Sequence, residues 1–286
     1  MPERITHLEE SYRKKLDKSR NWTKVVVCSD IHAGSKVAVS SIKNDTPIQR
    51  EINKRKDELV AKHKSPDILV CNGDGIEGLP KKKQASVWTA DLQLQQTDFT
   101  DLLLEWKAKA YWFVQGTGTH VDNEEGFSYE EGTARQVARH FPVGRYSEDR
   151  YVHYVLHLNV HDRILRFRHK IGNTTVPYGI ATDPLKKSVN NCLNATHGTE
   201  PLADYLLFGH VHRFSCIRTS RYNVVTLPGW KAVGDKYGET NCDGYVDVGL
   251  VIFYINKKTG KIILDWDVES IIAPNFEKTA EDVFKE

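Results

Sequence analysis

Four short runs of apolar residues, each followed by polar residues and three of them also by glycine, constrain the fold of this chain more than any other feature. The runs span residues 25–28, 68–71, 111–114 and 205–208. Runs of this kind are typical of strands that are buried on both faces. In open α/β sheets, ligands bind just beyond the carboxyl ends of such strands. The sequence therefore predicts an α/β fold with a site where these strands end.

Short motifs rich in Asp and His follow these runs. In chain order they are Asp30-Ile31-His32, Gly73-Asp74, Gly118-Thr119-His120 and Gly209-His210-Val211-His212, with His169 alone between the last two. Imidazole nitrogen and carboxylate oxygen suit divalent transition metals, and one carboxylate can bridge two ions. Asp and His side chains from several strand ends therefore indicate a two-metal hydrolytic site.

Two of these motifs place candidate ligands two residues apart. Side chains at positions i and i+2 share one face of an extended segment. We therefore expect Asp30 and His32 to lie on one face, and His210 and His212 to form a second pair of the same kind.

The order and spelling of the motifs resemble those of the calcineurin-like metallophosphoesterases. That family's pattern is Asp-x-His, Gly-Asp, Gly-Asn-His, a lone His and Gly-His-x-His, and the resemblance covers residues 25–214. It implies an α/β layered sandwich of two mixed β-sheets flanked by helices. It also implies two divalent metal ions, manganese or else iron, zinc, nickel or magnesium, and hydrolysis of a phosphoester by a hydroxide held between them.

The resemblance also assigns roles to single residues. The implied ligands are Asp30, His32 and His212 for the first ion, His169 and His210 for the second, and Asp74 as a bridge. His120 matches the histidine that binds no metal and instead supports the phosphoryl oxygen or leaving group, and Asp122 is expected to orient it. Glu77 is expected either to support a ligand or to lie in a solvated loop. His197 competes with His169, but it falls in a predicted loop.

One position departs from the family's pattern. The Asn that binds the second ion is replaced by Thr119, or by Thr117 if Gly118-Thr119 is an insertion. A hydroxyl is a shorter and poorer ligand than an amide carbonyl, so we expect the second ion to bind more weakly. Thr119, a water molecule, Asn123 or Asp122 would complete that site. The Gly-Thr spelling is similar to that of phage-type members of the family.

The substrate is less well specified by the sequence. Lys36 and Arg213 neighbour metal motifs and are expected to contact phosphate oxygens. Further candidates for contacts with a base or a nucleic-acid backbone are Trp88, Trp230, Tyr237 and Lys81-Lys82-Lys83. We expect a phosphodiesterase or nuclease acting on nucleotides or nucleic acid. The alternatives are a phosphomonoesterase acting on small molecules or phosphoproteins, and a non-catalytic metal-binding scaffold protein of the same fold.

Composition adds few constraints. The chain has 286 residues, a net charge of +2 and five cysteines. The weak net charge gives no general signal for a polyanionic partner. An odd cysteine count without paired spacing favours reduced thiols. No stretch approaches the roughly 20 apolar residues of a membrane helix, and the first residues lack the apolar region of a signal peptide. We therefore expect a cytoplasmic protein with no membrane partner.

The expected elements form one domain with additions at both ends. Beyond the four runs, helices are expected at 6–19, 48–64, 91–110, 127–140 and 183–193, and strands at 151–158, 164–168, 214–218, 222–227, 246–255 and 262–268. We expect an N-terminal helix within residues 1–22 packed on the core, a single metallophosphoesterase domain at 23–273 and a C-terminal tail at 274–286.

Overall fold

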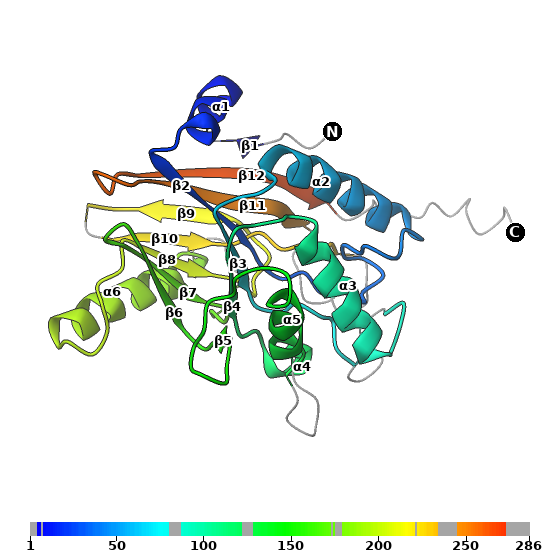
Figure 1. Cartoon of the computed structure of the whole chain (residues 1–286). Helices are drawn as coiled ribbons and strands as arrows, with labels where there is room; N and C mark the ends of the chain where they lie inside the picture. Colours follow the sequence, from blue (N-terminus) through cyan, green and yellow to red (C-terminus); the bar gives the residue numbers. More distant parts are fainter. Residues whose placement is uncertain are drawn as a thin grey trace, which may run out of the picture.

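Two β-sheets pack face to face at the centre of the molecule, and helices cover the outer face of each (Figure 1). The structure is a computed structural model that describes residues 5–6, 8–79, 87–121, 128–172, 174, 179–220, 222–233 and 245–272, of which 5, 6, 119, 121 and 245 are described by their backbone alone. The predicted α/β sandwich of two mixed sheets is confirmed.

The first sheet has seven strands with a parallel centre. Its strands, in spatial order, are β1 (Ile5–Thr6), β12 (Ile262–Ile272), β11 (Tyr245–Asn256), β2 (Trp22–Cys28), β3 (Ile68–Asn72), β4 (Tyr111–Val114) and β5 (Val152–His153). Strands β2 to β5 pair in parallel, whereas β11 runs antiparallel to both β2 and β12. The carboxyl ends of β2, β3 and β4 therefore meet at one edge of the molecule.

The second sheet has five strands and the same parallel centre. Its order is β6 (Leu156–Val160), β7 (Arg163–Arg168), β8 (Tyr205–Phe208), β10 (Asn223–Thr226) and β9 (Ser215–Arg218). Strands β7, β8 and β10 are parallel, and the outer strands are antiparallel to them. The loops after β7 and β8 consequently leave the sheet at the same end.

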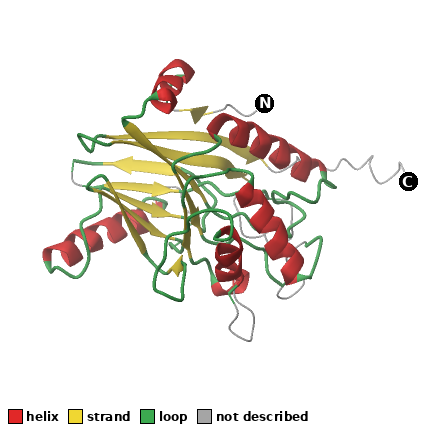
Figure 2. Ribbon diagram, in the orientation of Figure 1, coloured by secondary structure: helices red, strands yellow, loops and turns green. Residues whose placement is uncertain are grey.

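Helices close both outer faces of the sandwich (Figure 2). They are α1 (Glu10–Lys18), α2 (Pro47–His63), α3 (Leu92–Leu104), the single turn α4 (Gly118–Val121), α5 (Tyr129–Val137) and α6 (Thr182–Thr196). Side-chain caps explain where several begin: Thr46 accepts from Gln49 N, and Asp91 accepts from the first turn of α3. None of the helices in the described ranges is long and apolar enough to span a membrane.

Strand β2 shows how an unbroken apolar run serves two interfaces at once. Val26 and Cys28 belong to the cluster that packs under α2, α3 and α5, whereas Val25 and Val27 belong to the cluster between the sheets. Successive side chains of a strand point to opposite faces, so both faces of such a run must be apolar when both are covered. This is why four apolar runs without alternation predict the centre of the fold.

Three element boundaries differ from the prediction. Ile5–Thr6 pairs with β12 as a strand, and the first helix starts at Glu10 rather than residue 6. The helix expected over 91–110 ends at Leu104, because the chain turns at Lys107 with φ 49°. The strand expected over 151–158 is two strands, since β5 joins the first sheet and β6 joins the second. The tail at 274–286 lies outside the described residues, and the predicted division into 1–22, 23–273 and 274–286 stays a prediction.

A buried carboxylate on β12 holds α2 against the first sheet. Asp267 is fully buried and accepts a hydrogen bond of 2.6 Å from Arg55 Nη2 and a second one from Lys62. Burial raises the pKa of Asp267, but His63, Lys62 and Arg55 outweigh it and hold the pKa below its usual range. The pair with Arg55 joins residues that are both shielded from water, so neither charge is screened.

We expect Asp267→Asn to destabilise the fold by about 3–5 kcal/mol, because it breaks the shortest and most buried ion pair of Arg55 and leaves only the 3.5 Å contacts to Glu58 and Glu269. Because its folded-state pKa is lowered, Asp267 stabilises the fold at neutral pH, and this stabilisation is lost as the pH falls below the ordinary Asp range. Denaturant unfolding from about pH 7 to about pH 3 should therefore show a shallower pH dependence for the variant. The control is Asp57→Asn, an exposed carboxylate beside Lys56, with an expected change within about 0.5 kcal/mol. Equal losses in the two variants would contradict this role of Asp267.

Candidate metal centre

Six of the predicted ligands converge where the parallel strands of both sheets end. They form two groups in which one ligand atom per residue lies within 4.8 Å of the others: Asp30, His32 and His212, and Asp74, His169 and His210. The first sheet supplies three of these side chains through the loops after β2 and β3. The loops after β7 and β8 of the second sheet supply the other three. The grouping agrees with the two-ion assignment, while the role of these residues as ligands stays a prediction.

His169 lies between the two buried carboxylates and joins the groups. Its Nε2 is 3.0 Å from Asp74 Oδ2 and 3.8 Å from Asp30 Oδ1. Asp30 Oδ1 is also 3.2 Å from His212 Nε2, which in turn lies 3.2 Å from His32 Nε2. Lone-pair atoms from separate strands thus face a common space. The predicted bridge through Asp74 remains a proposal, because the shared distances involve Asp30 as much as Asp74.

The loops reach this geometry through left-handed backbone rather than extended segments. Asp30, His32, Asp74, His210 and His212 have φ values of 55°, 51°, 52°, 73° and 51°. Such values are uncommon outside glycine, are tolerated best by Asn, Asp and His, and cluster at functional sites. The expectation that Asp30 with His32, and His210 with His212, share one face of an extended segment is therefore wrong. They converge because each loop turns back on itself.

Backbone hydrogen bonds lock the loop after β2 to the loop after β3. Asp30 N donates to the Gly73 carbonyl, and His32 N donates to the Asp74 carbonyl, each at 3.0 Å. Glycine is required where the loops touch, since a Cβ on Gly116 would lie 2.2 Å from Asp74 N and Oδ1. The two carboxylates are thus fixed by main chain as well as by side chains.

Each carboxylate also accepts hydrogen bonds that favour its charged form. Asp30 accepts from Ser29 Oγ at 2.5 Å and from His210 N at 3.1 Å. Asp74 accepts from Thr117 N at 2.6 Å and from Thr117 Oγ1 at 3.0 Å. Burial raises both pKa values, but the charge of His169 and the other imidazoles outweighs burial and holds the pKa of Asp30 and of Asp74 below the usual range.

The electrostatics of this centre fit a cation. Burial lowers the pKa of His169, yet Asp74 and Asp30 together raise it to about 10. The two carboxylates therefore draw a positive charge to the space between them. His169 Nε2 is buried and faces the two carboxylates, at 3.0 Å from Asp74 Oδ2 and 3.8 Å from Asp30 Oδ1, which is where a cation would replace the proton of the ring. Its Nδ1 is fixed at 2.7 Å from the Asn72 carbonyl, the outer contact typical of metal-binding histidines.

Thr117 contacts this cluster. Thr117 follows β4 directly and reaches Asp74 with both its backbone N–H and its hydroxyl. Thr119 lies one turn further on in α4, and only its backbone is described. Of the two alignments open from the sequence, the geometry favours Gly116-Thr117 as the counterpart of the family's Gly-Asn. The alternative fillers Asp122 and Asn123 lie outside the described residues.

A third group surrounds His32. His32 Nδ1 lies 2.9 Å from Glu77 Oε2, and Lys231 Nζ donates to Glu77 Oε1 at 2.9 Å. Burial raises the pKa of Glu77, but His32 and Lys231 outweigh it and lower the pKa to about 2. Glu77 is only 3% exposed, so the solvated-loop interpretation is wrong. It orients His32, which is the other role considered for it.

His120 belongs to this third group and to neither of the two groups of predicted ligands. Its ring meets that of His32 edge to face at 4.6 Å. Its Nδ1–H donates to the Glu77 carbonyl at 2.6 Å, because a carbonyl oxygen can only accept. This fixes the ring and leaves Nε2 for a substrate oxygen. Asp122, the predicted orienting residue, lies outside the described residues, and the Glu77 carbonyl provides the orientation seen here.

Glu130 was missed by sequence reasoning although it supports both loops. Its Oε2 accepts from Gly116 N at 2.9 Å and its Oε1 from Gly75 N at 3.3 Å, so one α5 side chain ties the loop after β3 to the loop after β4. Burial raises the pKa of Glu130 to about 8. No motif marks this residue, since it contacts only backbone N–H groups.

The predicted substrate contacts are not brought to the cluster in the same way. Lys36 is exposed, and no side-chain contact of it within the described ranges reaches the two groups. Arg213 is 8% exposed and lines a small separate cavity with Val211 and Thr226. Trp230 is buried in the core, so its role as an aromatic platform is wrong. Trp88 is half-buried near Lys43, while Lys81-Lys82-Lys83 and Tyr237 lie outside the described residues.

The order of the motifs, the two mixed sheets and the site at their shared edge agree. This is the fold that the resemblance to the calcineurin-like metallophosphoesterases implies. No protein-family model matches the chain, and no curated protein matches it at a significant level.

Three solved structures illustrate what this chain is similar to. An archaeal phosphodiesterase is 11% identical over 88% of this chain and 100% of its own, with a TM-score of 0.41. Vps29 from Entamoeba histolytica complexed with zinc is 10% identical over 86% and 99%, with a TM-score of 0.36. A putative 5'-nucleotidase from Staphylococcus aureus is 14% identical over 91% of this chain and 56% of its own, with a TM-score of 0.48. At these identities the likeness concerns the fold, and the argument for activity rests on this chain's residues.

We expect Glu130→Gln to weaken metal binding about tenfold or more, the usual effect of losing a residue that supports a ligand. Above about pH 8 the ionised Glu130 accepts from both glycine N–H groups, whereas the amide can accept from only one and opposes the other with its own donor. The control is Glu131→Gln on the same helix, since Glu131 accepts from Tyr151 N and Val152 N, away from the cluster. Calorimetric titration with manganese should separate the two variants. Unchanged affinity in Glu130→Gln would show that Glu130 does not hold Asp74 in place.

Proposed function

We propose that this chain is a metal-dependent phosphoester hydrolase of the calcineurin-like family, and that its substrates are the phosphodiester bonds of nucleotide derivatives or nucleic acid. The observation that carries the proposal is the pair of buried carboxylates facing four imidazoles from both sheets, with His120 beside them. Nitrogen and carboxylate ligands in two adjoining groups suit two divalent transition metals. Bound there, such ions would activate water for attack on phosphorus and neutralise charge on the phosphoryl oxygens.

The protein's own residues prepare this chemistry. Asp30, Asp74 and their hydrogen-bond donors provide a fixed negative cradle, so that little reorganisation accompanies binding. Glu77 holds the His32 ring with its Nε2 toward Asp30. The His120 ring is fixed through Nδ1. Its Nε2 is therefore placed to exchange a proton with the leaving oxygen.

The charge around the site favours a diester over a monoester. A phosphomonoester carries an additional negative charge that a nearby Lys or Arg would have to balance. Lys231, the lysine next to the groups, is already engaged by Glu77 at 2.9 Å. Of the predicted phosphate contacts, Lys36 is exposed and Arg213 lines a separate small cavity, so the singly charged diester is the better match.

We expect the purified protein to hydrolyse bis-p-nitrophenyl phosphate with manganese, zinc, nickel or magnesium, faster than p-nitrophenyl phosphate, and a chelator to abolish this activity. Glu77→Gln should lower the rate by about 10–100-fold, as for other residues that orient a ligand, and Asp74→Asn should lower it further. The matched control is Asp101→Asn, an exposed carboxylate on α3, which should keep full activity.

Each outcome of this panel is informative. Preference for the monoester would replace the diesterase by a phosphomonoesterase. Metal binding without hydrolysis of either ester would favour the non-catalytic metal-binding protein. Full activity in Asp74→Asn would contradict the assignment of Asp74 as a ligand.

We expect two unequal metal-binding events, with the weaker one at Asp74, His169 and His210. The hydroxyl of Thr117 stands where the family supplies an amide oxygen, and a hydroxyl is the poorer ligand. Thr117→Asn should therefore tighten the weaker event, whereas Thr119→Asn, which makes the same change in α4, should leave it unchanged. Calorimetry and elemental analysis after dialysis measure both effects. Tightening by Thr119→Asn alone would reverse the alignment favoured here.

A further inference from the structure

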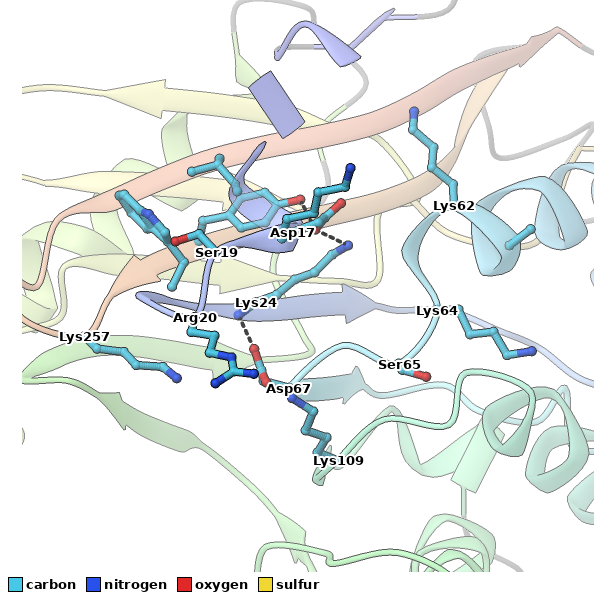
Figure 3. A pocket seen from close by; sticks show the side chains of 15 residues that line it. Asp17, Ser19, Arg20, Lys24, Lys62, Lys64, Ser65, Asp67, Lys109 and Lys257 are labelled. Carbon is cyan, nitrogen blue, oxygen red and sulfur yellow. Dashed lines mark hydrogen bonds and ion pairs between the residues drawn. The ribbon is translucent and has the colours of Figure 1, made fainter. Parts of the chain in front are cut away.

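A second concave site lies at the opposite end of the first sheet from the metal centre. A cavity of about 540 Å³ opens around the starts of β2, β3 and β4, where Trp22, Asp67 and Lys109 line it (Figure 3). The metal motifs follow the other ends of the same strands. Strand β2 has seven residues, which at about 3.3 Å per residue separates its two ends by roughly 20 Å. The cavity is therefore not part of the metal centre.

The lining of this cavity is strongly basic. Seven of its side chains are Lys or Arg and two are Asp. Both carboxylates are already engaged: Asp17 by Lys24 Nζ at 2.8 Å and by Tyr254 at 2.9 Å, and Asp67 by Lys109 Nζ at 2.6 Å. The acidic groups of the cavity consequently do not neutralise its remaining cations.

Four cations of the lining are exposed and have no ion pair within the described part of the chain. They are Lys18, Arg20, Lys64 and Lys257. Cations near the ends of α1 and α2 offset the helix dipoles, which accounts for Lys18 and Lys64. Arg20 and Lys257 lie outside any helix, so the dipoles do not account for them. In Figure 3 both extend on the same side of β2 as Asp67 and Lys109.

The size and chemistry of the cavity select the class of ligand. Its volume falls within the range of pockets that hold small molecules. A small anion such as a single phosphate would leave most of the space unfilled, whereas several phosphate groups would match the several cations. Trp22 is half-buried in the lining and offers an aromatic face on which a base can stack.

We propose that this cavity binds a nucleoside polyphosphate, with Arg20 and Lys257 contacting the phosphates and Trp22 the base. The site is separate from the proposed hydrolytic centre and does not depend on that centre being active. Because the cavity lies apart from the metal centre, it gives this chain a place to hold a nucleotide that is not being hydrolysed.

Titration calorimetry on the full chain in the presence of a chelator tests this proposal. The probes are ATP, tripolyphosphate, adenosine and a single-stranded oligonucleotide. We expect saturable binding of ATP, weaker binding of tripolyphosphate and none of adenosine. Arg20→Ala combined with Lys257→Ala should weaken ATP binding about tenfold or more, as loss of charge-assisted hydrogen bonds does. Trp22→Leu, checked for folding by circular dichroism, should remove the preference for ATP over tripolyphosphate.

Two controls separate this site from general charge and from the metal centre. Arg139→Ala combined with Lys186→Ala removes the same charge from exposed positions elsewhere and should change ATP affinity by no more than about twofold. Asp74→Asn should bind ATP as the unmodified protein does. Absence of saturable ATP binding, an equal loss in the charge control, loss in Asp74→Asn, or tighter binding of the oligonucleotide than of ATP would each overturn the proposal. Failure of hydrolysis alone would leave it standing.

Discussion

Two carboxylates buried side by side impose the main electrostatic constraint on this protein. Asp30 and Asp74 are almost completely shielded from water, and an isolated buried charge is strongly unfavourable. The fold compensates them with N–H and hydroxyl donors from three loops and with imidazoles from both sheets. The left-handed backbone at five of the six candidate ligands serves the same end, because only such turns direct these groups inward. The site is in this sense the reason for the local strain around it.

Much of this arrangement follows from sequence alone, because the signals are carried by side-chain type and strand burial. Apolar runs without alternation predict strands covered on both faces, and their ends locate the site. Neither signal identifies Thr117 or Glu130 as a residue that contacts the site. Their contacts are made to backbone N–H groups or to another ligand, and neither residue type announces such a contact in one sequence. The expectation that His210 and His212 share one face of an extended segment was wrong about the backbone, since a spacing of two residues does not report φ.

Boundary errors have a similar physical origin. Residues 151–158 are rich in aromatic and aliphatic side chains, as one strand would be, but the run is divided between the two sheets. Local pattern records burial and cannot record which sheet buries a residue. Ile5–Thr6 illustrates the same limit, because the pairing with β12 involves residues more than two hundred and fifty positions away. In each case pairing with a strand that is distant in the sequence, rather than local propensity, determines where the strand forms.

Each of the two groups of candidate ligands contains side chains from both sheets. Asp30 and Asp74 lie on loops of the first sheet, and His169 and His210 lie on loops of the second. Between these sheets lies an apolar interface whose attraction is non-directional and would tolerate sliding. A coordinated ion tolerates very little displacement of its ligands. An ion held by ligands from both sheets would therefore cross-link them at the edge of the sandwich and fix the position of one sheet relative to the other. Metal binding would then stabilise the packing of the two sheets, and not only the few side chains that touch the ion.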